Sequence, residues 1–377
     1  LHLYSVDATG PARRLTTGDY DVEQARPAAD RRSILFTSNQ GDADRRHVWR
    51  VPADGSAPPQ QITRGDGIET APAQVADGTV FVIAATARQP GLPSRVRGAV
   101  PEAIARELVP AEFPERELVA PQAVTFRAAD GLTIHGQLFA SPSCKSGCRA
   151  VVFTHGGPIR QMLPGWHYLR YYAHAYAENQ FLASQGIVVL SVNYRLGTMY
   201  GHDFREAPSS GWRGSAEYQD VLAAAGYLAA LPQVDKKRIG LWGGSYGGLL
   251  TALGLARNSD MFKAGVDFHG VHDWSAFLDR WEDNLADAPD KSEAEALAFK
   301  SSPVADVARW RSPVLFIHGD DDRNVPFDET TDLIQRLRRQ GVRLEEIVYP
   351  DEVHDLLLWR SWIDAYRATA AFFAKEL

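Results

Sequence analysis

The sequence has little of several features, and each scarcity excludes a class of protein. Its longest apolar runs, such as residues 187–190, fall far short of the roughly 18 residues that suggest a membrane span. Lysine and arginine total 40 against 47 aspartates and glutamates, a formal net charge of -7, and the basic residues form no run that could follow a phosphate backbone. We therefore expect a soluble protein whose partners include neither a membrane nor a nucleic acid.

Cysteine is also scarce, with only Cys144 and Cys148 in the 377 residues. A lone C-x-x-x-C pair lacks the further ligands of a zinc site, and we expect neither a metal nor another cofactor. The two thiols could close a small disulfide in a periplasmic or secreted protein, or stay free in a cytoplasmic one. The chain begins at Leu1 and shows no charged leader, so any targeting segment has been removed or never existed.

The first part of the chain contains an internal repeat. Leu-Thr-Thr-Gly at 15–18 recurs as Ile-Thr-Arg-Gly at 62–65, a period of about 47 residues that is typical of four-stranded propeller blades. Residues 1–88 have room for two blades, whereas closed propellers need about four or more. We therefore expect the C-terminal blades of a β-propeller whose N-terminal segment lies on the same or a separate chain. Prolines punctuate residues 89–121, which predicts a linker.

Residues 122–377 show a different pattern, in which short apolar runs alternate with helix-length segments. This alternation predicts a mostly parallel sheet with helices on both faces. The expected strands are 150–154, 187–192, 239–242, 264–267, 314–317 and 344–349.

Ser245 lies in a Gly-Gly-Ser-Tyr-Gly-Gly turn at 243–248, between an expected strand and an expected helix. Small residues on both sides let the backbone turn sharply and lift the serine hydroxyl above the sheet. This nucleophile elbow predicts an α/β-hydrolase fold. The sequence therefore predicts Ser245 as the nucleophile.

A nucleophilic serine needs a histidine base, which a carboxylate holds in position. In this fold the acid and the base follow the serine on loops after later strands. His354 alone lies between the last expected strand and the terminal helix, so we expect it to be the base. Three adjacent acids at 320–322 follow the preceding strand, and the pattern alone does not choose among them.

The chain resembles the prolyl oligopeptidase family of serine peptidases, especially its dipeptidyl peptidase IV and acylaminoacyl peptidase branches. The motifs that carry the resemblance, in chain order, are His-Gly-Gly-Pro at 155–158, Asn-Tyr-Arg at 193–195, the turn at 243–248, the loop at 318–326 and Asp-Glu-Val-His at 351–354. The resemblance implies that Asp322 is the catalytic acid, because it lies four positions after the histidine of the His-Gly turn. It also implies an oxyanion hole made by the backbone N–H groups of Gly157 and Tyr246.

The resemblance further implies a pocket for the residue that precedes the cut bond. An aromatic, apolar lining would accept proline, alanine or a larger apolar side chain, although Trp281 replaces a smaller tyrosine and argues against a strict proline preference. Asn324 resembles the residue that binds the preceding peptide carbonyl. The implied pocket residues are Val271, Trp274, Phe277, Trp281, Asn324 and Val325, joined by Tyr246.

These observations predict a serine exopeptidase that releases N-terminal dipeptides or acylated residues from short peptides. A carboxylesterase on the same fold is the alternative, although such esterases normally carry a helical cap where this chain has a propeller repeat. A catalytically inactive binding module is disfavoured by the complete triad. The sequence does not distinguish dipeptidyl from acylaminoacyl activity, and it leaves open whether the chain forms a homodimer.

Overall fold

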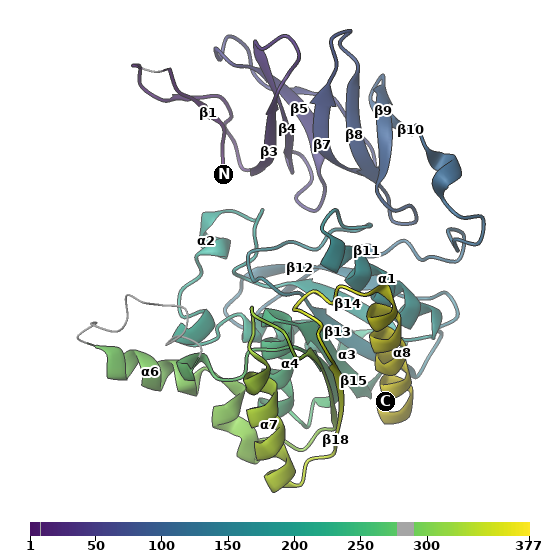
Figure 1. Cartoon of the computed structure of the whole chain (residues 1–377), viewed down its shortest axis with the longest axis vertical. Helices are drawn as coiled ribbons and strands as arrows, with labels where there is room; N and C mark the ends of the chain where they lie inside the picture. The colour runs from purple at the N-terminus through teal and green to yellow at the C-terminus, as the bar shows by residue number, and fades with distance from the viewer. Residues whose placement is uncertain (8, 277–289) are drawn as a thin grey trace. The chain divides into compact units, whose positions relative to one another are not determined.

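The computed structural model describes residues 1–7, 9–276 and 290–377, and the chain divides into two compact units (Figure 1). The first unit comprises Leu1–Ala123, Gln161–Ala177 and Thr198–Arg205. The second comprises Val124–Arg160, Glu178–Gly197 and Glu206–Leu377. Within the described residues, no helix combines the length and the hydrophobicity that crossing a membrane requires.

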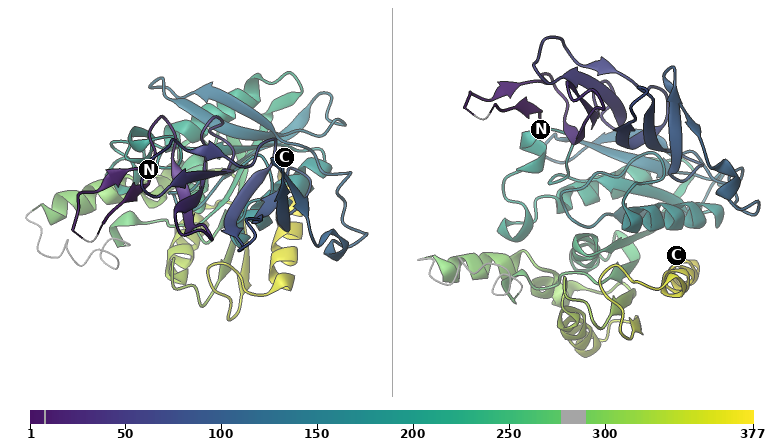
Figure 2. Two further views of the ribbon diagram at one scale, coloured as in Figure 1. Left: turned by 90° about the horizontal axis from the view of Figure 1, so that it is seen from above. Right: turned by 45° about the horizontal axis from the view of Figure 1, so that its top comes forward.

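The first unit contains two four-stranded antiparallel sheets, with strand orders β3-β4-β5-β6 and β10-β9-β8-β7. Their strands are drawn in purple to blue in Figure 2. Apolar side chains from both sheets, among them Leu35, Val48 and Val82, form one buried cluster. A four-stranded meander is the unit from which a propeller blade is built. The strands are β1 (Tyr4–Ser5), β2 (Arg13–Arg14), β3 (Val22–Pro27), β4 (Ser33–Ser38), β5 (His47–Pro52), β6 (Gln60–Gln61), β7 (Ile68–Gln74), β8 (Val80–Ala85), β9 (Leu92–Arg97) and β10 (Val100–Ala103).

The sequence repeat has a structural counterpart in two equivalent threonines. The Thr16 hydroxyl accepts the N–H of Leu3 at 2.9 Å, and the Thr63 hydroxyl accepts the N–H of Val48 at 2.8 Å. Both threonines are fully buried. Each repeat therefore uses its threonine to satisfy a backbone donor inside the sheet.

Part of the expected linker is regular structure. Residues 92–103 form β9 and β10, and Gly98 makes the tight turn between them with a φ of 63°. Pro101 lies in β10, an edge strand, where a missing N–H is tolerated. Pro101 is therefore compatible with an edge strand. The domain limits 1–88, 89–121 and 122–377 stay a prediction.

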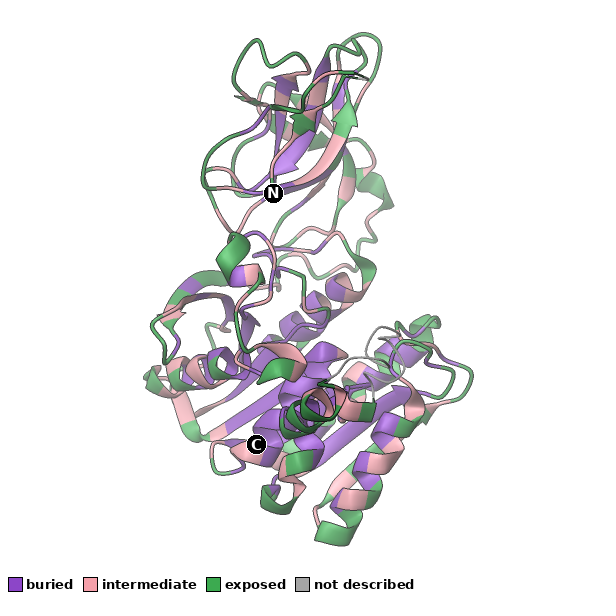
Figure 3. Ribbon diagram, turned by 90° about the vertical axis from the view of Figure 1, so that its left-hand side faces the viewer, coloured by how far each residue is buried: buried purple, intermediate pink, exposed green. Residues whose placement is uncertain are grey.

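The second unit is built on an eight-stranded sheet of order β11-β12-β14-β13-β15-β16-β17-β18. Strands β13 to β18 run parallel to their neighbours, and β12 pairs with β14 in antiparallel register. The central strands are buried (Figure 3). The strands are β11 (Gln122–Arg127), β12 (Thr133–Phe139), β13 (Cys148–Thr154), β14 (Val188–Asn193), β15 (Val234–Gly244), β16 (Phe262–Phe268), β17 (Val314–Gly319) and β18 (Leu344–Tyr349).

Helices cover both faces of this sheet. A Cβ on Gly240 would lie 3.0 Å from the ring of Phe373 in α8, whereas Gly254 of α4 packs against the side chain of Leu241. Successive strand residues face opposite sides, so α8 and α4 lie on opposite faces, as Figure 1 shows. The α-helices are α1 (Arg170–Ser184), α2 (His202–Arg205), α3 (Tyr218–Ala230), α4 (Tyr246–Arg257), α6 (Lys291–Lys300), α7 (Phe327–Gln340) and α8 (Trp359–Glu376), and the 3-10 helices are η1 (Arg106–Leu108), η2 (Gly211–Arg213) and η4 (Pro303–Arg309).

The six expected strands coincide with β13 to β18, with one difference in burial. Strand β18 was expected to be apolar and buried, but Glu345 and Glu346 are exposed. The reason is that β18 is the edge strand of the sheet, where one side faces solvent.

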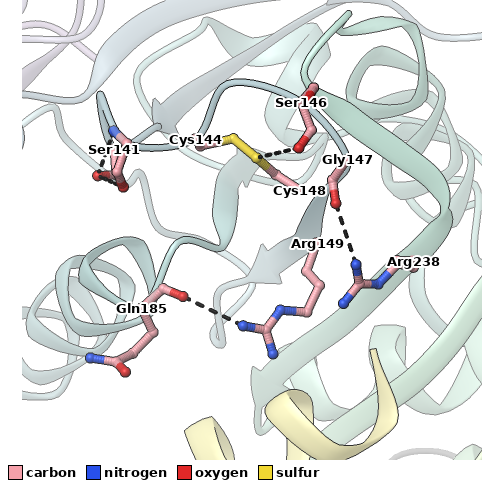
Figure 4. Close-up of a disulfide and its surroundings, with 9 residues drawn as sticks. Ser141, Cys144, Ser146, Gly147, Cys148, Arg149, Gln185 and Arg238 are labelled. Atoms are coloured by element: carbon pink, nitrogen blue, oxygen red, sulfur yellow. Dashed lines mark hydrogen bonds between the residues drawn. A yellow bond between two sulfur atoms is a disulfide. The ribbon is translucent and has the colours of Figure 1, made fainter.

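The two cysteines form a disulfide that closes the loop before β13. Cys144 and Cys148 have a Cα–Cα separation of 6.0 Å (Figure 4). Beside the loop, the guanidinium of Arg238 donates to the carbonyl of Gly147 at 3.3 Å. Of the two alternatives that the sequence left open, the structure therefore has the disulfide.

Candidate active site

Ser245 lies on the sharp turn between β15 and α4. Its φ of 61° is a backbone conformation that non-glycine residues rarely adopt. A Cβ on Gly243 would lie 2.5 Å from the carbonyl oxygen of Thr154, and one on Gly247 would overlap the same atom. Only glycine therefore fits on either side of the serine, which is the packing reason for the G-x-S-x-G pattern.

Asp322 is held by donors on both oxygens. Oδ1 accepts the N–H groups of Asn324 at 2.8 Å and Val325 at 3.0 Å, whereas Oδ2 lies 2.6 Å from His354 Nδ1 and 3.1 Å from His318 Nε2. Burial alone would raise the pKa of Asp322, but the hydrogen bonds from His318 and His354 outweigh it and hold the pKa well below its usual value. The ionised carboxylate only accepts, so Nδ1 of His354 carries the proton of this hydrogen bond.

The two acids beside Asp322 have other partners. Asp320 Oδ1 accepts the N–H of Asp351 at 2.7 Å, and the exposed Asp321 pairs with Arg323 at 3.3 Å. Among the described residues, Asp322 is the one member of this run that contacts an imidazole. The carboxylate beside His354 is thus the one that the family resemblance implied.

The serine turn and the histidine loop meet at the same edge of the sheet. The N–H of Ser245 donates to Phe268 O at 2.9 Å, and the N–H of His269 donates to Ile317 O at 2.8 Å, which joins the ends of β15, β16 and β17. The ring of His269 lies 4.2 Å from the ring of His354, centroid to centroid. In the described part of the chain the Ser245 hydroxyl has no hydrogen bond, and such bonds often tighten only when substrate binds.

The two expected oxyanion donors lie at the ends of neighbouring strands. Tyr246 is the first residue of α4, where backbone N–H groups point out of the helix, and Gly157 follows β13 with a φ of 123°. The Thr154 hydroxyl donates to Gly247 O at 2.9 Å and ties the end of β13 to the serine turn. The role of both N–H groups stays a prediction.

The expected pocket residues are described only in part. Val271, Trp274 and Val325 are buried, and the ring of Tyr246 lies 5.8 Å from that of Trp274. The side chain of Asn324 is exposed, while its N–H donates to Asp322. Phe277 and Trp281 lie outside the described residues.

The sequence interpretation missed Glu217, which lies immediately before α3. Its side chain is fully buried, and it accepts hydrogen bonds from the phenol of Tyr246 at 2.7 Å and from the N–H of Gly211 at 3.1 Å. Burial raises the pKa of Glu217, although these hydrogen bonds act in the opposite direction. A carboxylate at a helix start is usually a solvated residue, so no local pattern singled it out.

A second buried network supports the loop that carries Val271 and Trp274. Nε2 of His272 lies 2.8 Å from Asp267 Oδ2, and Oε2 of Glu329 accepts the N–H of His272 at 2.7 Å. The run of histidine and aspartate at 267–273 was the available sequence signal. Isolated histidines are more often packing residues, so this run by itself does not predict the buried network.

Comparisons with known proteins agree with this architecture. The sequence profile of the prolyl oligopeptidase family matches residues 173–377, and that of the dipeptidyl peptidase IV (DPP IV) N-terminal region matches residues 1–94. The uncharacterized peptidase YuxL of Bacillus subtilis is 28% identical over 254 residues, which make up 64% of this chain and 36% of that protein. Dipeptidyl aminopeptidase BIII of Pseudoxanthomonas mexicana is 27% identical over 215 residues, 54% of this chain and 30% of that protein.

Solved structures extend the likeness over nearly the whole chain. An acylaminoacyl peptidase in complex with Z-Gly-Gly-Phe-chloromethyl ketone has a TM-score of 0.80 at 24% identity, over 98% of this chain and 58% of that chain. A puromycin hydrolase has a TM-score of 0.81 at 21% identity, over 99% of this chain and 58% of that chain. At these identities the likeness shows the fold, an α/β-hydrolase domain preceded by propeller blades. Because the family profile covers more than half of the sequence, including the serine turn and both loops, the chain belongs to the prolyl oligopeptidase family.

Proposed function

We propose that the protein is a serine exopeptidase that hydrolyses short peptides through an acyl-enzyme intermediate. One observation carries the proposal: the buried, ionised Asp322 holds Nδ1 of His354 at 2.6 Å, at the sheet edge where Ser245 occupies its strained turn. A histidine that a carboxylate holds in place is the base that activation of a serine hydroxyl requires. Relatives named dipeptidyl aminopeptidase and acylaminoacyl peptidase support peptide bonds as the target.

The proposed reaction has two steps. Ser245 Oγ attacks the scissile carbonyl carbon while its proton passes to Nε2 of His354, and that proton then goes to the leaving amine as the C–N bond breaks. A water molecule next attacks the acyl carbon and gives its proton to Nε2. The bond between that carbon and Ser245 Oγ then breaks, Oγ takes the proton from Nε2, and the acid product leaves. Asp322 stays ionised throughout and stabilises the imidazolium that forms in each step.

The backbone N–H groups of Tyr246 and Gly157 would bind the developing oxyanion. Removing one such donor typically costs about 2.7 to 4 kcal/mol of transition-state stabilisation. The start of α4 adds the positive end of a helix dipole at the same place.

Substrate choice would come from the apolar pocket beside Ser245. Val271, Trp274 and Val325 would line the subsite for the residue before the cut bond, and Asn324 would bind the preceding carbonyl. Each misplaced methylene is worth only about 1 to 3 kcal/mol, so we expect a graded preference for apolar residues, not an absolute one.

Two measurements test this proposal. A fluorophosphonate probe should label the protein once and should not label Ser245→Ala. The rates with a free-amine dipeptide p-nitroanilide and with its N-acetylated form then decide the class: preference for the free amine indicates a dipeptidyl peptidase, and preference for the blocked amine an acylaminoacyl peptidase. Rapid cleavage of a p-nitrophenyl ester with no hydrolysis of either peptide would instead support a carboxylesterase.

The disulfide between Cys144 and Cys148 bears on location. Disulfides persist mainly in oxidising environments, so we propose a periplasmic or secreted protein. Fractionation of cells that express the natural protein tests this: recovery in the cytoplasm with both thiols reduced would contradict it.

A further inference from the structure

Three side chains from three different loops converge beside the serine turn. His269 follows β16, Asp322 follows β17 and His354 follows β18, and one nitrogen or oxygen of each lies within 4.8 Å of the others. Two imidazoles and one carboxylate form a donor set that suits Zn²⁺ and similar divalent transition ions.

We propose that His269, Asp322 and His354 form an inhibitory site for Zn²⁺. The site rests on the proposed function, since the ion would take the histidine that serves as the base. His269 has no part in the proposed reaction. Its position beside Asp322 and His354 adds a third ligand to the two that the catalytic pair provides.

The geometry requires only a small rearrangement. Nδ1 of His354 already lies 2.6 Å from Asp322 Oδ2, and the ring of His269 contacts that of His354 at 4.2 Å between centroids. Ligands at about 2.0 to 2.1 Å from a tetrahedral Zn²⁺ lie roughly 3.3 Å from one another. Binding of Zn²⁺ would therefore widen the Nδ1–Oδ2 pair from 2.6 Å to roughly 3.3 Å and would shorten pairs that are now up to 4.8 Å apart. The His354 side chain is 13% exposed and offers the ion a route from solvent.

Two other buried histidines, His318 and His272, have hydrogen-bond partners of their own. Nδ1 of His318 bonds to Thr330 Oγ1 at 2.8 Å, and its Nε2 faces Asp322 at 3.1 Å and Val325 O at 3.1 Å. Both ring nitrogens of His272 have partners, in Asp267 and in the carbonyl of Glu329. The third ligand is His269, because it is the histidine that lies within 4.8 Å of the ligand atoms of both Asp322 and His354.

Coordination of Zn²⁺ by Nδ1 of His354 would abolish base catalysis, because it changes which ring nitrogen carries the proton. A neutral imidazole carries one proton, and a metal on Nδ1 of His354 forces that proton onto Nε2. The nitrogen that must accept the Ser245 proton then has no lone pair. Metal binding and peptide hydrolysis therefore exclude each other without any change in the net proton count of the ring.

The test uses the 377-residue chain with no polyhistidine tag. Binding is measured first on Ser245→Ala by competition between the protein and a chromogenic chelator for Zn²⁺, which needs no activity. We expect one ion per chain. On the unsubstituted chain, Zn²⁺ should inhibit peptidase activity, EDTA should restore it, and Mg²⁺ should have no effect because it prefers oxygen ligands.

The deciding variant is His269→Gln, with His202→Gln as the matched control because His202 is an exposed histidine far along the chain from the cluster. His269→Gln should raise the half-inhibitory Zn²⁺ concentration at least about tenfold, given that losing even a supporting ligand contact costs 10- to 100-fold in affinity. His202→Gln should leave it unchanged. If His269→Gln fails to fold, His269→Phe, which conserves a planar ring, takes its place.

Equal Zn²⁺ inhibition of His269→Gln and the unsubstituted chain would overturn the proposal, as would the absence of chelator competition by Ser245→Ala. If the chain cleaves no peptide, the proposed function fails. The metal site is then still decided by whether Ser245→Ala competes with the chelator for Zn²⁺ and His269→Gln competes less well.

Discussion

The phenol of Tyr246, the residue directly after the serine of the turn, donates a hydrogen bond of 2.7 Å to Oε1 of the buried Glu217. This bond ties the start of α4 to the start of α3. The Tyr246 ring faces Trp274 at 5.8 Å, so the bond also sets one wall of the proposed pocket.

We expect Tyr246→Phe to destabilise the protein by about 1 to 3 kcal/mol, because it removes the shorter of the two hydrogen bonds to the buried Oε1 of Glu217 and leaves only the longer one from the N–H of Gly211. Glu217→Gln keeps an acceptor for the phenol and should cost less. Urea unfolding of both single variants and the double variant gives the coupling energy. The control is Tyr349→Phe, which removes an exposed bond to Asp364 and should change stability by less than about 0.5 kcal/mol. Tyr246→Phe with the stability of that control would contradict the prediction.

We expect Asp322→Asn to reduce peptidase turnover by up to about 10⁴-fold, because the amide favours the wrong tautomer of His354. The measurement is kcat on a dipeptide p-nitroanilide. Asp321→Asn is the matched control, since this exposed neighbour pairs only with Arg323 among the described ion pairs. Similar losses in both variants would mean that the loop had been perturbed, not one carboxylate.

Stability in acid should depend on His155. Burial lowers its pKa to about 4, below the value near 6.5 of an unfolded histidine. Between pH 6.5 and 4 the unfolded chain binds a proton at His155 that the folded protein excludes. The free energy of unfolding therefore decreases as the pH is lowered from 6.5 to 4, by up to about 3 kcal/mol from this residue. Urea unfolding at pH 7.5 and 4.5 measures this decrease in the free energy of unfolding. The decrease should be smaller in His155→Phe, which keeps an aromatic ring against Tyr194, than in the unsubstituted chain. In His202→Phe it should be the same as in the unsubstituted chain. The same decrease in His155→Phe as in the unsubstituted chain would exclude His155 as its source.

The disulfide should contribute little to stability. It closes a loop with a sequence separation of only 4, and in the chain-entropy account so short a loop is worth about 2 kcal/mol at most. We expect the double variant Cys144→Ser, Cys148→Ser to fold with a free energy of unfolding lower by that amount or less. Urea unfolding measures it, and reduction of the unsubstituted chain by dithiothreitol provides the comparison. A loss of several kcal/mol in both would show that the loop supports β13.

Local features of the sequence predicted the strands and the serine turn. A buried parallel strand is a short apolar run, and the steric demand at Gly243 and Gly247 leaves glycine as the residue that fits. The serine, the acid and the base each lie on a loop directly after a predicted strand, so their order along the chain could also be read from the sequence. Each of these features leaves a mark in the local sequence, an apolar run or a pair of glycines, even where the packing partner is the distant Thr154.

Tertiary structure decided what depends on distant residues. Nothing local in Glu217 indicates that it meets Tyr246, because that contact exists only once α3 and α4 pack on the same sheet. His269 comes beside His354 because β16, β17 and β18 are neighbours, an order that a one-dimensional pattern does not contain. Pro93 and Pro101 lie in strands because β9 pairs with β8 and β10 pairs with β9, and this backbone pairing across the sheet outweighs a local preference for irregular chain.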